Sequence, residues 1–177
     1  MGKSTLANRV GDAWRARVTS TDKLGRHPGR PWPKLSPPVE EYYSRLTDET
    51  IYWFLQVHHQ NIWPVVERRI ALERETPGRF VLEGSALRPE LIATLDVSDL
   101  LVVGLFADPD FLRNRMEIES QYAEQDEHRK ALISRFIARS LRDNDEIIRD
   151  AERLKLPLLD VANSASLQDA VEKLAAA

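Results

Sequence analysis

The sequence predicts an α/β fold in which parallel strands alternate with helices in a doubly wound sheet. Near-continuous apolar runs at residues 79–83 and 99–106 suit central strands that are covered on both faces. Segments with helical periodicity lie before and after these runs. A chain of 177 residues can bury one substantial core and is too short for two ordinary domains. We therefore expect a single domain over residues 1–177.

The expected elements follow from apolar spacing, which predicts helices and strands, and from crowded Gly and Pro residues, which predict a loop. In chain order they are a helix over residues 4–15, a β-prone stretch over 17–20, a loop over 22–38, a helical insert over 39–75, strands over 79–83 and 99–106, helices over 109–119 and 127–154, a strand over 156–161 and a helix from about Ser166. Pro64 is expected to kink or split the helical insert.

The composition limits the classes of partner. The 25 Lys and Arg residues oppose 28 Asp and Glu residues, so no global basic field favours nucleic acid or an anionic membrane. The absence of Cys excludes a disulfide framework and suits a reducing compartment, so we expect a cytoplasmic protein. The longest apolar runs have the length of strands, far below the roughly 20 residues that a membrane span needs. We expect neither a nucleic-acid nor a membrane partner.

A phosphate-binding motif is half present at the start of the chain. Gly2-Lys3-Ser4-Thr5 matches the last four positions of G-x-x-x-x-G-K-[ST] and leads into an amphipathic helix. In that motif the helix N-terminus faces the phosphates of ATP, Lys3 reaches the terminal phosphates, Ser4 offers its hydroxyl to Mg²⁺ and Thr5 supports it. The alternative is an ordinary helix start with Ser4 as its cap.

The motif is followed by Ser20-Thr21-Asp22 and by Val81-Leu82-Glu83-Gly84, and with them most of the chain resembles the P-loop kinase group. Within that group, residues 20–28 are similar to the segment after the second strand of zeta-toxin-like and 2-phosphoglycerate kinase-like proteins. The resemblance implies a three-layer P-loop NTPase fold with a parallel sheet and a helical insert. It also implies an ATP-dependent kinase that moves the γ-phosphoryl group to a small hydroxylated metabolite or nucleotide-like acceptor.

The first half of the phosphate loop and the strand before it do not precede Gly2 in this sequence. In such a fold that strand lies in the middle of the sheet, so its two neighbours would lose their shared partner. Unpaired buried backbone groups cost about 1–3 kcal/mol each. We expect the true start to lie upstream; otherwise the sheet closes across the gap or borrows a strand from a partner.

Two carboxylates are expected at the carboxyl ends of strands. The resemblance implies that Asp22 is the general base or orients the acceptor, and that Glu83 holds magnesium through water. The alternatives are a turn-forming Asp before Gly25 and a Glu that caps the next helix. Ser85 and Arg88 are expected to line the same cleft.

Arginines are expected to bind phosphate from a lid. Arg115 resembles the motif arginine of the helix that leads into the kinase lid, and residues 117–130 suit that lid. Arg135, Arg139 and Arg142 recur at i, i+4 and i+7 on one helix face, which suits a polyphosphate. The alternative is a solvated face paired with nearby acids. Residues 160–164 resemble the loop that packs on adenine.

The remaining aromatic and histidine residues are expected to be structural. They are His58 and His59, which are expected in the core or at its edge, and Tyr42, Tyr43, Trp53 and Trp63, which have the spacing of core residues. His27 is an open candidate for the acceptor site. Two other function classes stay open, a P-loop ATPase switch and a non-catalytic nucleotide-binding-fold domain.

Overall fold

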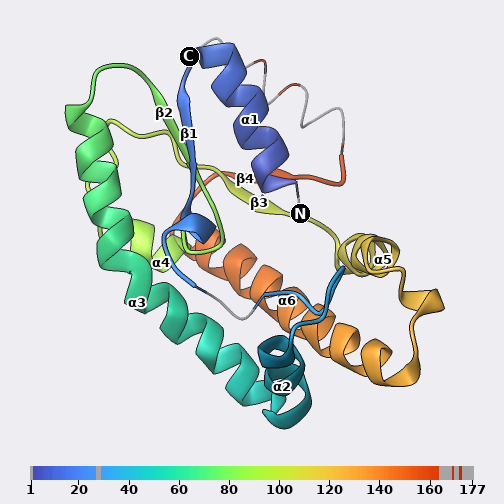
Figure 1. Cartoon of the computed structure of the whole chain (residues 1–177). Coiled ribbons are helices and arrows are strands. Elements are labelled where there is room, and N and C mark those ends of the chain that lie inside the picture. The colour runs from blue at the N-terminus through green and yellow to red at the C-terminus, as the bar shows by residue number, and fades with distance from the viewer. Residues whose placement is uncertain (1, 27–28, 164–168, 170–171, 173–177) are drawn as a thin grey trace. The chain divides into compact units, whose positions relative to one another are not determined.

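The protein has a mixed α/β architecture (Figure 1). Its structure, a computed structural model, describes residues 2–26, 29–163, 169 and 172. The α/β class is therefore confirmed, with short parallel strands in two small sheets. In chain order the elements are α1 (Lys3–Trp14), β1 (Arg17–Ser20), η1 (Thr21–Lys23), α2 (Pro37–Arg45), α3 (Asp48–Glu75), β2 (Phe80–Glu83), α4 (Pro89–Ile92), β3 (Gly104–Phe106), α5 (Pro109–Glu119), η2 (Tyr122–Glu124), α6 (Glu127–Arg153) and β4 (Leu158–Asp160).

The chain divides into two compact units. The first consists of Met1–Arg26, His59–Phe106 and Ile147–Ala177, and contains all the strands of the described residues. The second consists of His27–His58 and Ala107–Glu146, and is helical. Helices α3 and α6 contribute residues to both units.

The strands of the first unit form two separate parallel pairs. In one pair β1 lies beside β2, with Arg17 opposite Phe80 and Ser20 opposite Glu83. In the other pair β3 lies beside β4, with Phe106 opposite Asp160. Within the described residues β2 and β3 each pair with a single strand, so the sheet does not close across the gap between them.

Two of the strands are shorter than the sequence predicted. The strand expected over 99–106 is reduced to β3, because Leu100 and Val102 pack into the hydrophobic core of the unit without a neighbouring strand. The strand expected over 156–161 is likewise reduced to β4. The residues of β2 are half-buried rather than covered on both faces. The helix expected from about Ser166 falls largely outside the described residues, as does His27.

Helices cover the strands of the first unit. Helix α1 buries Leu6, Ala7 and Val10 and contacts both β1 and β2. The second half of α3 supplies a core cluster formed by Trp63, Val66 and Ile70 together with Ile92 of α4. Helix α3 continues through Pro64, so the helical insert is not split at this residue. The insert instead divides between α2 and α3, where Leu46 is extended.

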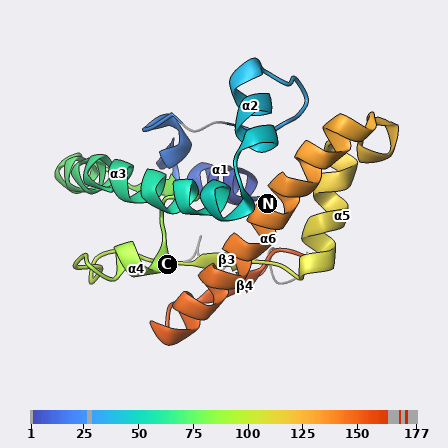
Figure 2. The same ribbon diagram turned by 90° about the horizontal axis from the view of Figure 1, so that it is seen from below.

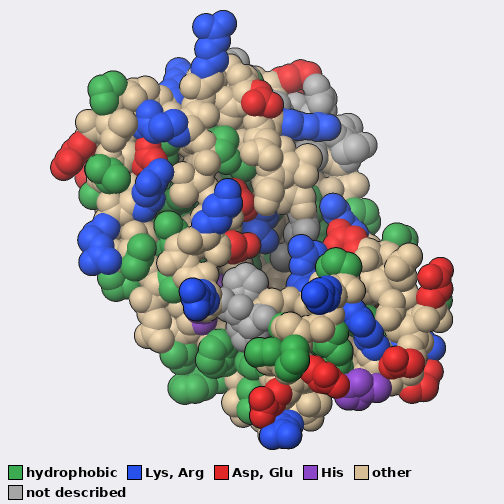
Figure 3. All heavy atoms as spheres, in the orientation of Figure 1, with side chains coloured by type: hydrophobic (Ala, Val, Ile, Leu, Met, Phe, Trp, Pro, Cys, Tyr) green, Lys and Arg blue, Asp and Glu red, His purple; other side chains and the backbone are tan. Residues whose placement is uncertain are grey.

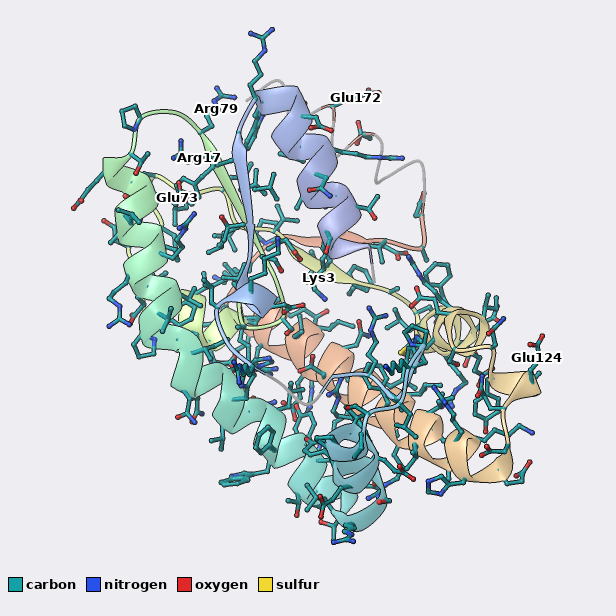
Figure 4. All side chains as sticks on the ribbon, viewed as in Figure 1. Lys3, Arg17, Glu73, Arg79, Glu124 and Glu172 are labelled. Atoms are coloured by element: carbon teal, nitrogen blue, oxygen red, sulfur yellow. The ribbon has the colours of Figure 1, made fainter. Side chains whose placement is uncertain are left out.

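A buried carboxylate ties α3 to β1. Glu73 is 4% exposed, and its Oε2 accepts a hydrogen bond of 2.6 Å from Nη2 of Arg17. Its Oε1 lies 2.7 Å from Nη2 of Arg69, which also donates to the hydroxyl of Thr19. Figure 4 shows Arg17 and Glu73 directed toward one another between the strand and the helix. One carboxylate thus pairs with two guanidinium groups.

We expect Glu73→Gln to lower the free energy of unfolding by about 2–3 kcal/mol. Removing one member of a buried ion pair costs roughly 3–5 kcal/mol, but Arg17 and Arg69 are about a third exposed, so water compensates part of the loss. Urea denaturation measures the change. Glu75→Gln, an exposed position on the same helix, is the control and should shift stability by less than about 0.5 kcal/mol. Equal shifts in the two variants would contradict a special role for Glu73.

A side-chain cap fixes the start of helix α5 in the second unit. Helix α5 begins at Pro109 because Asp108 caps it, accepting hydrogen bonds from the backbone N–H groups of Asp110 and Phe111. Helices α5 and α6 lie side by side in both ribbon views (Figures 1 and 2).

The expected lid, residues 117–130, forms the end of α5, η2 and the start of α6. Its Gln125 donates to the carbonyl of Ser120.

Most of the residues expected to be structural are buried, whereas His58 is half-buried and Trp53 is exposed. Tyr42 and Tyr43 pack edge to face, with ring centroids 4.9 Å apart. Trp63 and His59 are also buried, which confirms their structural placement. Trp53 is 63% exposed, contrary to the expectation from its spacing.

The surface carries charges of both signs. On the face shown in Figure 3, Lys and Arg side chains are interspersed with Asp and Glu side chains. Every helix in the described part of the chain is too short or too polar to cross a lipid bilayer.

Candidate functional site

The ends of β1 and β2 bring the two predicted motifs together. Their parallel register places Ser20 opposite Glu83, so the residues that follow each strand leave the sheet at the same edge. Gly84 follows β2 with φ +147°, and a Cβ at this position would lie 1.8 Å from the hydroxyl oxygen of Thr21. Only glycine permits this approach. The contact holds Thr21, and with it the start of the segment that carries Asp22, against the end of β2.

The start of α1 lies at this same edge. Gly2 adopts a left-handed conformation with φ 79°, and no side chain caps the helix. The first backbone N–H groups of a helix have no acceptor within it and attract anions. The hydroxyl of Ser4 donates to Oε1 of Glu83 at 3.1 Å. The alternative that Ser4 caps the helix is wrong, because Ser4 lies inside α1 and its hydroxyl bonds the strand end.

Glu83 does not cap the next helix either. Helix α4 begins at Pro89 with Arg88 as its N-cap, whereas the carboxylate of Glu83 accepts from Ser4. Arg88 was expected to line the cleft; it is 2% exposed and donates to Glu90 at 2.6 Å. Its side chain thus contacts the first turn of α4.

Two charged side chains at this edge lack an ion-pair partner within the described residues. They are Lys3, which is half-buried at the start of α1 (Figure 4), and Asp22, which is exposed in η1. The carboxylate of Asp22 makes no hydrogen bond to the described backbone, so a turn-stabilising role has no support. The two charges are of opposite sign and are both available to a ligand.

Two further polar groups lie at this edge: Thr21, to which sequence reasoning gave no role, and Ser85, which was expected to line the cleft. The hydroxyl of Thr21 is buried without a hydrogen-bond partner among the described residues, next to Gly84. The hydroxyl of Ser85, one residue further along, lies 3.2 Å from Nε2 of the buried His59. Thr21 stands inside Ser20-Thr21-Asp22, the segment that carries part of the resemblance, and this place in the sequence was the signal for it. No sequence signal pairs Ser85 with His59, because 26 residues separate them.

The predicted arginines belong to the second unit. Nε of Arg115 lies 3.2 Å from Glu119, one turn further along α5. Nη1 of Arg139 donates to the hydroxyl of Tyr43 at 3.1 Å. Arg135 and Arg142 are ion-paired with Asp48 and Glu49, so these two members of the row are paired with acids, as the alternative to phosphate binding expects.

The oxygen atoms at the strand edge fit a magnesium ion. Mg²⁺ is held by one or two carboxylates, hydroxyls, waters and substrate phosphates rather than by a cage of protein ligands. The hydroxyl of Ser4 and the carboxylate of Glu83 supply such oxygens 3.1 Å apart. No cluster of three or more His, Cys, Asp or Glu side chains suited to a metal occurs in the described residues.

The loop expected to pack on adenine follows β4. Its Asp160 accepts a hydrogen bond from the backbone N–H of Ala162 at 2.8 Å, which turns the chain directly after the strand. Ser164, the last residue of that expectation, lies outside the described residues. A role in adenine binding stays a prediction.

Comparison of the chain with family models, curated proteins and solved structures finds no match.

Proposed function

We propose that the chain is an ATP-binding phosphotransferase of the P-loop kinase type, which moves the γ-phosphoryl group of ATP to a hydroxyl of a small acceptor. The observation that carries the proposal is the hydrogen bond between Ser4 and Glu83. It joins the start of α1, with its free N–H groups and the unpaired Lys3, to the carboxyl end of β2. A three-layer P-loop fold is part of this proposal.

Each residue at the edge has a distinct task in the proposed reaction. The backbone at Gly2, together with Lys3 and Thr5, binds the β- and γ-phosphates and neutralises their charge. Ser4 and Glu83 hold Mg²⁺, Glu83 through water. The metal supplies charge neutralisation on the transferring group and on the leaving oxygen.

The transfer step needs a base and an oriented acceptor. The acceptor oxygen attacks the γ-phosphorus, and the bond from that phosphorus to the β,γ-bridging oxygen breaks, so ADP leaves. Asp22 takes the proton of the acceptor hydroxyl, or holds that hydroxyl in line. Because Asp22 is exposed and unpaired, it can reach a ligand without first breaking a salt bridge.

The resemblance assigns the lid of the proposed kinase to residues 117–130 and the motif arginine to Arg115. Its pair with Glu119 is 3.2 Å long and its side chain is 40% exposed. Exposed i,i+4 pairs contribute only about 0.3–0.5 kcal/mol, so a phosphate can replace the carboxylate at small cost.

Calorimetric titration of Mg·ATP into the full chain tests the proposal. We expect saturable binding that Lys3→Ala weakens at least about tenfold, because a hydrogen bond to a charged group contributes about 1.5–3 kcal/mol. Arg9→Ala is the matched control, since it removes a cation from an exposed position on the same helix. This variant should bind as the parent does.

The outcomes separate the function classes. Saturable binding that Lys3→Ala removes, with ADP release that depends on an added acceptor, supports the kinase. The same binding with ADP release in the absence of any acceptor favours an ATPase switch. A folded chain that binds no Mg·ATP would overturn the proposal and leave a non-catalytic domain.

A further inference from the structure

A serine and a buried histidine meet beside the carboxyl end of β2. The hydroxyl oxygen of Ser85 lies 3.2 Å from Nε2 of His59, a residue of α3. The side chain of His59 is 1% exposed, whereas Ser85 is half-buried and so remains partly open to the surface. Both residues belong to the first unit. A hydroxyl and an imidazole at this separation have the geometry of a nucleophile and its general base.

Other hydroxyls of the first unit have different surroundings. The hydroxyl of Ser4 donates to a carboxylate, and that of Thr21 belongs to a fully buried residue. The hydroxyls of Thr76 and Thr94 donate to backbone carbonyls three or four residues earlier in the chain, a local contact that stabilises a helix end. Among these five hydroxyls, that of Ser85 combines partial exposure with an imidazole partner.

The turn after β2 keeps Ser85 at the edge where ATP is proposed to bind. The backbone N–H of Leu87 donates to the carbonyl of Gly84 at 3.4 Å, so the chain turns directly after the strand. Ser85 follows Glu83 by two residues, a separation of at most about 7 Å along the backbone. Glu83 in turn accepts the hydrogen bond of Ser4 at the start of α1. Ser85 is therefore close to the groups that the proposed function assigns to magnesium and phosphate.

We propose that Ser85 is a site of autophosphorylation and that His59 accepts the proton of its hydroxyl. The Oγ atom of Ser85 attacks the γ-phosphorus of bound ATP, the bond from that phosphorus to the β,γ-bridging oxygen breaks, and ADP leaves. The hydroxyl proton passes to Nε2 of His59, in the tautomer that carries its own proton on Nδ1. The proposal rests on the proposed kinase function, which supplies the bound ATP.

The modification would limit the activity of the site that produces it. A phosphoserine carries a charge of about −1.5 to −2 at pH 7. At Ser85 this charge lies two residues from the carboxylate of Glu83 and repels the phosphates of an incoming nucleotide. We therefore expect the phosphorylated chain to bind Mg·ATP more weakly than the unmodified chain.

Incubation of the full chain with Mg·ATP, followed by mass spectrometry of its peptides, tests the proposal. We expect one phosphate on Ser85, formed at a rate per chain that does not depend on the chain concentration, because ATP and Ser85 lie in the same molecule. Ser85→Ala should remove this phosphate. His59→Gln, whose amide can hydrogen-bond the serine but cannot take its proton, should slow the reaction at least about 100-fold.

Two further variants are the controls. Lys3→Ala should lose phosphorylation of Ser85 together with Mg·ATP binding, whereas a contaminating kinase would label this variant as well as the parent. Ser98→Ala removes an exposed hydroxyl from the same unit and should leave phosphorylation of Ser85 unchanged. Urea denaturation shows whether each variant keeps its fold. If His59→Gln unfolds, Ser85→Thr gives the comparison, since it keeps a hydroxyl and should be phosphorylated where Ser85→Ala is not.

Calorimetry of Mg·ATP with the parent chain separates this proposal from the kinase function. If Mg·ATP binds and Ser85 stays unmodified, autophosphorylation is overturned while the kinase proposal stands. If the folded chain binds no Mg·ATP, both proposals fail. Phosphorylation of Lys3→Ala or of folded His59→Gln at the rate of the parent would overturn the inference. A rate per chain that rises with chain concentration would also overturn it, because the phosphate would then come from a second molecule.

Discussion

Asp22→Asn lowers acceptor-dependent phosphoryl transfer by about 100-fold or more, with Mg·ATP affinity changed by less than about threefold. Asparagine keeps the size of the side chain and can still orient a hydroxyl, but it cannot take the proton. General-base catalysis contributes roughly 10²–10⁴-fold to a rate. The measurement is ADP release with a panel of hydroxylated metabolites, together with calorimetry of Mg·ATP.

The matched control is Asp12→Asn, at an exposed position on α1. It removes the same charge from the same unit, away from the ends of β1 and β2. Turnover in this variant should equal that of the parent. Unchanged turnover in Asp22→Asn would remove Asp22 from the mechanism, and a parallel loss of ATP affinity would give it a binding role.

Gly84→Ala is expected to lower the free energy of unfolding by about 3 kcal/mol or more. At φ +147° an L side chain is strained by about 1–3 kcal/mol, and forcing an extra methyl group into a packed site costs a further 1–3 kcal/mol. The new methyl group would lie 1.8 Å from the hydroxyl oxygen of Thr21, so one of the two strand ends must move. Urea denaturation measures the loss.

A second variant separates the clash from the backbone strain. Combining Gly84→Ala with Thr21→Ala removes the hydroxyl, so part of the lost stability should return, while the strain at φ +147° remains. Mg·ATP affinity should fall in Gly84→Ala, since the displaced strand end carries Glu83. Stability equal to that of the parent in the single variant would contradict the close approach of the two strand ends.

The sequence predicted helices better than strands, for a physical reason. Helix α5 begins and ends where the apolar spacing and the Pro109 start predicted, because its cap at Asp108 is local in sequence. A strand exists only where a partner lies beside it, and partners are distant in sequence. The apolar run at residues 99–106 therefore predicted the burial of Leu100 and Val102 but overestimated the strand.

The candidate site, too, could be predicted from the sequence only in part: its residues were indicated, but their contacts were not. The motif at the start of the chain pointed to Lys3 and Ser4, and the resemblance to the P-loop kinase group pointed to Asp22 and Glu83. The contact between Ser4 and Glu83 spans 79 residues, and no local pattern encodes it. The sequence likewise did not distinguish Arg139 from Arg135 and Arg142, because their partners Asp48 and Glu49 begin a different helix.

The hydrogen bond between Ser4 and Glu83 also has a consequence for the proposed site before any nucleotide binds. The hydroxyl proton is donated to the carboxylate, so the lone pairs of the Ser4 oxygen stay available. In the proposed reaction these lone pairs would meet a magnesium ion that arrives with the phosphates, while the bond to Glu83 is kept. The serine would thus be oriented in advance, and little side-chain entropy would be lost when the metal–nucleotide complex binds.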